Sequence, residues 1–323
     1  SHMPISKELE QILDEQTPWN PETAKRRLAE HAELVAKIEH IATLSTRSSS
    51  NIPSDHRGFT QVRAGINGCR ILLLKARLAA EAGDEAETLR LVSAAANLGS
   101  HYHDIESPSL HDETVAIPVD LNIHRATFTT LLPALGKSAD LVRWKSVLGR
   151  KVYSSGEFAK VLRGEWHIGA DFMVFPMLGV MKQSGGLPDA EATAHSYSFR
   201  FNQSIADIPS RSLADLMNYD FQAAGGVSHL SEEGRSIMDL NSTGYNAWPQ
   251  CYANQATIQQ QYQAALDLLI LEKSGATLTP ADASRIAHDP VSGSPFVFDA
   301  ASRQISTPTG TVTSTPDPLT LPW

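Results

Sequence analysis

The residue best suited to chemistry in this sequence is a glutamate that falls on an apolar helical face. The spacing of apolar residues predicts a helix from Gly156 to Leu178. Glu165 lies in the middle of one face of it, which also carries Phe158, Val161, Leu162, Ile168, Phe172 and Phe175. A carboxylate in such surroundings is paired, protonated or functional. Glu165 is therefore the first catalytic candidate, as a general acid or base or as a metal ligand.

Glu165 also has a structural interpretation. An arginine from a packed helix could hold the carboxylate in an ion pair, and the sequence offers Arg63, Arg70 and Arg125 for this. His167 is a further catalytic candidate because it follows Glu165 closely. It falls on a different face of the same helix, where a solvated row of charged residues is the simplest role.

His124 is a candidate of another kind. It shares a predicted helical face with four apolar residues, Ile117, Leu121, Phe128 and Leu131. A lone histidine on such a face is most often a satisfied core residue. If it met Glu165 across a helix interface, the two would form a partly buried acid and base couple.

Histidines and aspartates also provide candidates for metal binding. His101 and His103 are two residues apart and His111 follows them, which suggests zinc. Two such side chains point the same way on a strand, but here they fall at the end of a predicted helix, where they diverge. Asp289 and Asp299 could bind calcium, although a plain turn is the simpler account. We therefore expect no cofactor and keep zinc and calcium as alternatives.

The chain lacks the motifs of common enzymes. It contains no HExxH, GxSxG, P-loop, GxGxxG or EF-hand sequence. A hydrolase-like enzyme would have to place its site between the 156–178 helix, residues 101–124 and the segment 182–209. Another alternative is a carbohydrate- or peptide-binding module, whose aromatic platforms would be Trp144, Trp166, Tyr197 and Trp248.

Composition excludes some partners. The 323 residues carry a net charge of −9 without any cluster of lysine and arginine, so nucleic acid is not an expected partner. No apolar run is long enough to span a membrane. Residues 1–3 read as an expression-vector remnant, so we expect that a native signal or anchor has been removed. Cys69 and Cys251 are too far apart for a CxxC motif, and their pairing is left open.

Helical spacing recurs through most of the chain, which predicts an all-α protein built as an irregular antiparallel array of helices. The clearest unit is an αα-hairpin whose two helices, 61–82 and 85–105, are joined by Gly83 and Asp84. We expect a single helical domain over residues 5–305.

Three segments depart from helical spacing. Residues 182–209 are rich in glycine, serine and proline and predict a long binding loop or lid. Residues 288–305 predict a turn followed by a small β-hairpin. Residues 306–323 predict an extended or disordered tail.

Short motifs add a resemblance. Leu162 to Glu165 read L-R-G-E, and a helix ends in Pro-Ser-Leu at residues 108–110. The C-terminal hairpin reads DP-x-[ST]-G-x-P-aromatic, with matches at Asp289, Pro290, Ser292, Gly293, Pro295 and Phe296. In these patches the chain resembles an uncharacterised family of helical bacterial proteins that are predicted to be secreted or membrane-anchored. The resemblance implies a helical body and a location outside the cytoplasm, and it implies no chemistry.

The leading hypothesis is therefore an extracytoplasmic interaction or scaffold protein whose partner is a protein or a component of the cell envelope. The structure can separate this hypothesis from the enzymatic one. An enzyme needs convergent polar groups in a pocket, whereas an interaction protein shows an exposed apolar patch or groove.

Overall fold

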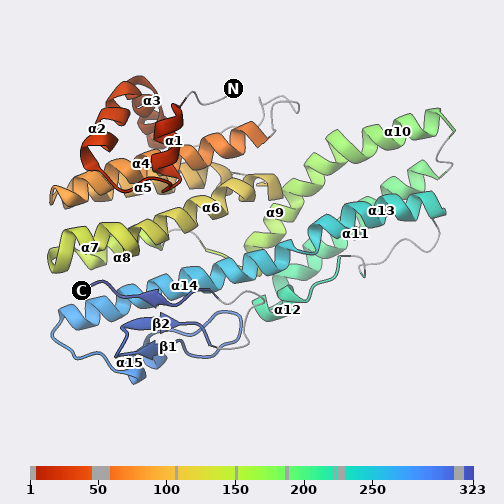
Figure 1. Cartoon of the computed structure of the whole chain (residues 1–323). Helices are drawn as coiled ribbons and strands as arrows, with labels where there is room; N and C mark the ends of the chain where they lie inside the picture. Colours follow the sequence, from red (N-terminus) through yellow and green to blue (C-terminus); the bar gives the residue numbers. More distant parts are fainter. Residues whose placement is uncertain are drawn as a thin grey trace.

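The structure of the chain is a computed structural model that describes residues 5–45, 59–105, 108–149, 152–185, 189–221, 223, 230–308 and 316–323. These residues are almost entirely helical, with a small antiparallel sheet near the C-terminus (Figure 1). The predicted all-α class with a C-terminal hairpin is confirmed. The vector remnant lies outside the described residues.

The N-terminal half of the body consists of packed helices. They are α1 (Lys7–Leu13), α2 (Pro21–Glu30), α3 (Ala32–Thr43), α4 (Phe59–Glu81), α5 (Glu85–His103) and α6 (Leu110–Ala126). Helices α4 and α5 form the predicted αα-hairpin. Gly83 turns the chain in the left-handed region at φ +76°, and the Asp84 side chain accepts from the Glu87 N–H at 3.0 Å, which caps α5.

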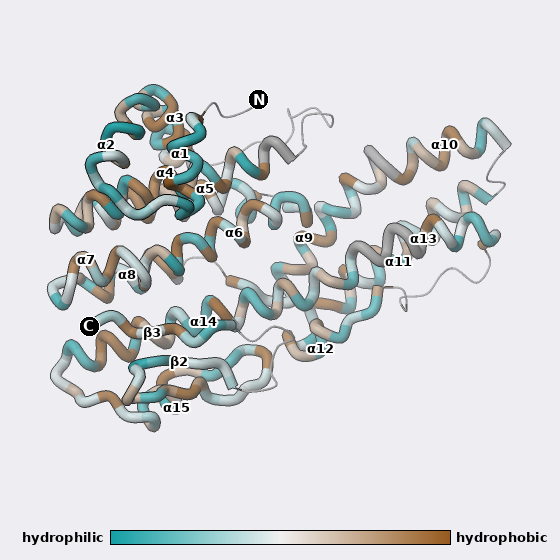
Figure 2. Tube along the Cα trace, in the orientation of Figure 1, coloured by the Kyte–Doolittle hydropathy of each residue, from teal (hydrophilic) through white to brown (hydrophobic). Residues whose placement is uncertain are grey.

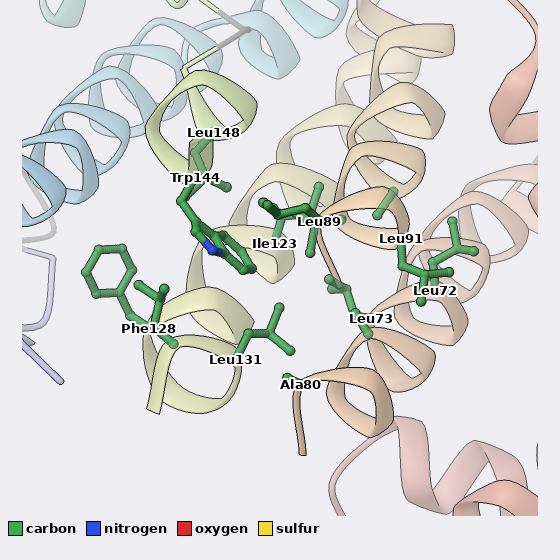
Figure 3. Close-up of a cluster of buried hydrophobic side chains, with 14 of the residues drawn as sticks. Leu72, Leu73, Ala80, Leu89, Leu91, Ile123, Phe128, Leu131, Trp144 and Leu148 are labelled. Carbon is green, nitrogen blue, oxygen red and sulfur yellow. The ribbon is translucent and has the colours of Figure 1, made fainter. Parts of the chain in front are cut away.

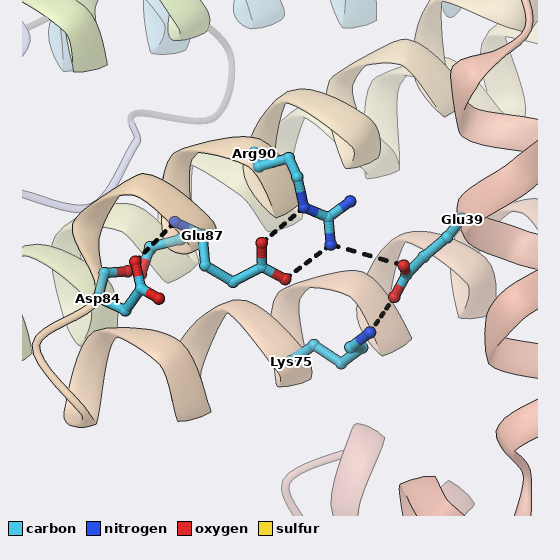
Figure 4. Close-up of polar contacts among 6 residues, drawn as sticks. Glu39, Lys75, Asp84, Glu87 and Arg90 are labelled. Atoms are coloured by element: carbon cyan, nitrogen blue, oxygen red, sulfur yellow. Dashed lines mark hydrogen bonds and ion pairs between the residues drawn. The ribbon is translucent and has the colours of Figure 1, made fainter.

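A polar network on the surface links three of these helices (Figure 4). The guanidinium of Arg90 on α5 donates to Glu87 at 2.6 Å and to Glu39 on α3 at 3.5 Å. Lys75 on α4 donates to the same Glu39 carboxylate. Because both charges at each contact are partly exposed, this network mainly fixes helix orientation and contributes little stability.

The middle of the chain contains two π-helical segments. After α6 follow η2 (Thr127–Leu131, π-helical), α7 (Leu132–Leu135), the 3-10 turn η3 (Gly136–Ser138) and α8 (Leu141–Leu148). The central predicted helix is observed as α9 (Ser155–Ile168), η4 (Gly169–Val174, π-helical) and α10 (Phe175–Gln183). Insertions of this kind into α-helices are frequent at functional sites.

The second half is also helical. Its elements are α11 (Ala190–Asp207), the 3-10 turn η5 (Ile208–Ser210), α12 (Leu213–Met217), α13 (Glu232–Tyr245), α14 (Trp248–Lys273) and α15 (Pro280–Ile286). Helices α10, α11 and α13 extend together away from the body (Figure 1), and we call them the arm.

The prediction of a long loop over residues 182–209 is wrong, because α11 occupies most of this segment. Its buried residues follow helical spacing and are Ala190, Thr193, Ser196, Tyr197, Arg200, Phe201 and Ser204. Ser184 and Gly185, two of the residues that indicated a loop, form a turn after α10, where Gly185 has φ +73°; residues 186–188 lie outside the described residues. Serines and alanines within α11 are small enough to face neighbouring helices, so their presence did not signal a loop.

The C-terminal sheet has three strands in the order β1 (Val297–Asp299), β2 (Gln304–Ser306) and β3 (Leu319–Thr320). Phe298 faces Ile305 across the predicted hairpin, and both are buried. The tail predicted as extended or disordered contains β3, which pairs with β2; residues 309–315 lie outside the described residues. Gln261 on α14 donates to the Ile305 carbonyl at 2.9 Å and anchors the sheet to the body.

Buried apolar side chains form two clusters. The first joins α1 to α8 with the C-terminal half of α14 and the sheet, and its largest member is the fully buried Trp144 (Figure 3). The second joins α9 to α13 with the N-terminal half of α14. Helix α14 supplies Tyr252 to the second cluster and Leu266 and Leu269 to the first, so it runs through both.

The two cysteines are not paired with each other. Cys69 is fully buried in α4, where its thiol lies 3.9 Å from the Val119 carbonyl, and burial raises its pKa. Cys251 is exposed in the first turn of α14. A thiol buried in this way is chemically inert.

Candidate functional site

Glu165 lies near the end of α9, just before the π-helical η4, and its side chain is partly buried. Its Oε2 accepts from the Leu110 N–H at 3.1 Å, and its Oε1 accepts from the Tyr245 hydroxyl at 3.4 Å. Burial raises the pKa of Glu165, and these two hydrogen bonds offset only part of that effect. The carboxyl group therefore connects α9 with α6 and α13.

No arginine considered for Glu165 pairs with it. All three contact carboxylates at or just after α1 instead, in the pairs Arg63–Glu10, Arg70–Asp14 and Arg125–Glu15. The prediction of an ion-paired Glu165 is therefore wrong. Its partners are uncharged donors, because the arginines lie on a face of the body that α1 covers.

The structure brings the three predicted regions together at Glu165. Leu110 comes from the 101–124 region, and Tyr197 of α11 comes from the segment 182–209. A Cβ at Gly169, one turn after Glu165, would overlap the Tyr197 hydroxyl, so this glycine permits the close approach of α11. Burial raises the pKa of both Tyr197 and Tyr245, which keeps both phenols neutral. Glu165 thus contacts the neutral Tyr245, and Tyr197 lies close by.

The backbone donor that Glu165 uses belongs to the first turn of α6. Ser109 and Asp112 form a capping box, in which the Ser109 Oγ accepts from the Asp112 N–H and the Asp112 carboxylate accepts from the Ser109 N–H at 3.0 Å. This leaves the Leu110 N–H for Glu165, at the positive end of the helix dipole. The Pro-Ser-Leu and L-R-G-E motifs therefore contact each other.

We expect Glu165→Gln to raise the thermal midpoint at neutral pH. The folded-state pKa is raised, so the stability from Glu165 is present below its ordinary value of 4.5 and is lost as the pH rises through the folded value. A glutamine can accept from the Leu110 N–H and donate to the Tyr245 hydroxyl without ionising. Thermal melts across acidic to neutral pH should therefore show a flatter pH dependence for this variant.

Glu157→Gln, at the start of the same helix and paired with the surface residue Lys160, is the matched control and should keep the wild-type pH dependence. A Glu165→Gln midpoint below that of the wild type at neutral pH, with the same pH dependence in both proteins, would show that ionised Glu165 does not destabilise the fold.

His124 is a core histidine. Its Nδ1–H donates to the Asp120 carbonyl at 2.8 Å, and its ring stacks on Tyr262 with centroids 4.8 Å apart. Burial lowers the pKa of His124 and keeps the ring neutral. The proposed couple with Glu165 is wrong, since Glu165 contacts α6 and α13 at other residues. His167 is exposed, and its ring meets the edge of the Trp166 ring.

The candidate zinc ligands are not brought together. His101 Nε2 lies 2.7 Å from the Leu44 carbonyl, whereas His103 Nδ1 lies 2.5 Å from a Glu113 carboxylate oxygen. His111 lies in the first turn of α6. Within the described ranges, no three histidine, cysteine, aspartate or glutamate side chains are grouped so that they could hold a metal.

The His103 contact belongs to a buried polar layer that sequence analysis missed. Glu113 is fully buried, and nearby the Tyr153 hydroxyl donates to the Asp120 carboxylate at 2.6 Å. Tyr153 packs edge-on against Tyr252 at 5.1 Å, so the layer lies where the two apolar clusters meet. A signal was present, because Glu113 and Asp120 are seven residues apart on the same apolar face as His124.

The candidate calcium ligands form turns. Asp289 is buried, and its carboxylate accepts from the Thr257 hydroxyl at 2.6 Å and from the Ser292 N–H at 2.8 Å. Gly293 follows at φ +69°, which explains a glycine in the DP-x-[ST]-G pattern. Asp299 accepts in the same way from Ala301 and closes the hairpin.

Of the four predicted aromatic platforms, two are buried and two are partly buried. Trp144 is fully buried and donates from its indole N–H to Glu85, and Tyr197 is 1% exposed. Trp166 and Trp248 pack against the second cluster. A binding module that uses these four residues is therefore not supported.

The arm carries an exposed apolar surface. Leu178 is the one buried residue within α10, and Val174 just before it is also buried. The side chains of Phe175, Met177 and Val180 are 37%, 40% and 67% exposed. Figure 2 shows the apolar residues along α10. A helix that packs on one side of a globular protein normally exposes charged and polar residues on its other faces.

Comparisons with known protein families, curated proteins and solved structures give no match for this chain. In the part of the chain that the structure describes, no helix has both the length and the apolar character needed to cross a bilayer.

Proposed function

We propose that this chain is a helical interaction protein, a scaffold that associates with a second copy of itself through the exposed face of α10. The single observation that carries the proposal is the exposure of Phe175, Met177 and Val180 on a helix that projects from the body. Apolar patches of this kind mark surfaces that are covered by a partner.

The charge on α10 is compatible with self-association. Its only charged side chain is Lys182, which pairs with Glu191 of the same chain, so two copies of this face do not repel each other. An anionic membrane surface is disfavoured, because a single and already paired lysine gives little electrostatic attraction.

The shape of the arm supports the same partner. Among the described residues, no heavy atom outside α10 lies within 4 Å of a Cβ built at Gly179, so another helix can approach the backbone of α10 closely there. The arm projects from the body, which leaves space for a second arm alongside it (Figure 1). Two-fold dimers are the commonest oligomers, and in them the same patch is used twice.

The enzymatic alternative receives less support. Glu165 already accepts hydrogen bonds through both carboxylate oxygens from Leu110 and Tyr245, which is the arrangement of a structural connection. A location outside the cytoplasm also remains part of the proposal. It rests on the motif resemblance, and fractionation of cells that produce the natural full-length protein would test it.

The test compares two exposed valines. Val180→Glu on α10 should weaken self-association by about 100-fold, because two valines leave each interface and each buried valine contributes about 1.5 kcal/mol. Val142→Glu on α8, where the valine is 65% exposed, is the matched control and should change nothing. Sedimentation velocity over a concentration series measures both. A wild-type monomer at all concentrations, or equal effects of the two variants, would overturn the proposal.

A further inference from the structure

The segment that leads into the arm repeats an arrangement found earlier in the chain. In both places a helix passes into a π-helical turn, and a Pro-x-Leu-Gly sequence follows. We call α6 with η2 and α7 the first unit, and α9 with η4 and α10 the second unit. The matching positions keep one constant offset in the sequence, and they are His124 and His167, Pro133 and Pro176, Leu135 and Leu178, and Gly136 and Gly179.

The backbones of the two units share the same register. In the first unit the Leu132 N–H donates to the Thr127 carbonyl. In the second unit the Phe175 N–H donates to the Ala170 carbonyl. Both bonds reach back five residues, as π-helical bonds do, and both lie just before a proline. A proline lacks an N–H and its ring clashes with the carbonyl four residues earlier in an α-helix, so a widened turn accommodates it. Phe175 is therefore the structural equivalent of Leu132.

The two units differ in what covers this equivalent position. In the first unit α4 packs against η2 and α7, and Leu132 is fully buried in the first apolar cluster. In the second unit α11 packs against α10, where Val174 and Leu178 are buried but Phe175 is 37% exposed. The rings of Phe175 and Tyr197 meet edge to face with centroids 6.5 Å apart, which orients Phe175. The second unit therefore leaves exposed a position that the first unit covers.

The exposed side of α10 is a continuous uncharged stripe. Helical spacing places five exposed residues on this stripe, namely Phe175, Pro176, Gly179, Val180 and Gln183. The buried Val174 and Leu178 lie on the opposite side of the helix. Met177 is also exposed, but its position on the helix is next to the buried side and away from Gly179. Helix α10 can therefore pack against α11 on one side and against another helix along the stripe.

A second copy of α10 fits this stripe. The first unit shows that a helix is the element that covers this position in the fold. The stripe carries no charge, so it does not repel its own copy. Gly179 lies in its middle and allows the backbones of two helices to approach each other. In a two-fold dimer that uses this patch, the element that meets α10 at the symmetry axis is α10 itself.

We infer that the α10 helices of two copies pack along this stripe, and that Phe175 is the main contact residue, buried in the dimer as Leu132 is buried in the first unit. The partner's α10 takes the place that α4 takes in the first unit. Met177 lies outside the contact, although it is as exposed as Phe175. This inference rests on the proposed self-association and adds which side of α10 is used and which residue contributes most.

Two alanine variants on the same helix test the inference. Phe175→Ala should weaken self-association by about 100-fold, because two phenylalanines leave each interface and the loss of each costs about tenfold. Met177→Ala is the matched control, since Met177 is 40% exposed, and should change the dissociation constant less than about threefold. Phe175→Leu, which introduces the residue type of Leu132, should also stay within about threefold of the wild type. Sedimentation velocity over a concentration series measures all three.

Hydrogen exchange followed by mass spectrometry, at low and high protein concentration, maps the contact. Peptides that cover α10 should exchange more slowly at high concentration, because the dimer buries this helix. Peptides from α8, which carries the exposed Val142, should exchange equally at both concentrations. Slower exchange in α10 together with an element outside the arm would show that a different element of the second copy covers the stripe, and would overturn the inference.

The outcomes separate this inference from the proposed function. A dimer that Val180→Glu weakens, but in which Phe175→Ala and Met177→Ala have equal effects, would overturn the inference and leave self-association through α10 standing. A wild-type chain that stays monomeric at all concentrations would overturn both.

Discussion

Glu113→Ala is expected to lower the free energy of unfolding by about 1–3 kcal/mol, the usual cost of leaving a buried polar group without its hydrogen-bond partner. Glu113 is fully buried and lies 2.5 Å from the Nδ1 of His103, which is itself 6% exposed. The substitution leaves the imidazole without this partner and opens a cavity beside Tyr153. Urea denaturation followed by circular dichroism measures the loss.

Two variants control this prediction. Glu113→Gln keeps the size and one hydrogen bond to His103, so it should retain most of the stability that alanine loses. Glu191→Ala, which removes an exposed carboxylate from the arm, should leave the denaturation midpoint unchanged. A Glu113→Ala denaturation midpoint equal to that of the wild type would show that the contact between Glu113 and His103 makes no net contribution to the stability of the fold.

The polar layer also lies where the arm joins the rest of the body. His103, Glu113, Asp120 and Tyr153 lie where the first apolar cluster meets the second, and the arm belongs to the second. Buried polar contacts of this kind specify how elements are placed as well as how stable they are. Calorimetry of Glu113→Ala should therefore show the second cluster melting before the first, as two transitions in place of one.

Trp144→Ala is expected to destabilise the protein by about 3–5 kcal/mol, as other removals of large buried aromatic residues do. Trp144 has no exposed surface and packs among residues of α6, η2 and α8, including Ile123 and Leu131 (Figure 3). Its indole N–H donates to Glu85 at 3.1 Å, so alanine loses this hydrogen bond together with the packing. Chemical denaturation gives the measurement.

Trp144→Phe separates the two contributions, because it keeps a ring in the core and removes only the hydrogen bond and part of the volume. It should cost less than half of the alanine effect. Val142→Ala, at an exposed position on the same helix, should stay within about 0.5 kcal/mol of the wild type. A small loss for Trp144→Ala would mean that α8 contributes little to the first cluster.

The sequence alone determined the local elements. Apolar spacing predicted the helices, Gly83 and Asp84 predicted the αα-hairpin, and the pattern after Asp289 predicted the C-terminal hairpin. Such features depend on backbone geometry within one or two turns, which is encoded in adjacent residues. Sequence spacing also placed Glu165 correctly on a face that is turned toward other helices.

Only the tertiary structure decided which residues meet. The Glu165 carboxylate contacts Leu110 and Tyr245, 55 and 80 positions away in the chain, and not the arginines that its charge favoured. Helical periodicity identifies the face on which a residue lies, but it carries no information on which other face packs against it. The same limit concealed the exposed face of α10, since its exposure results from how whole helices pack together.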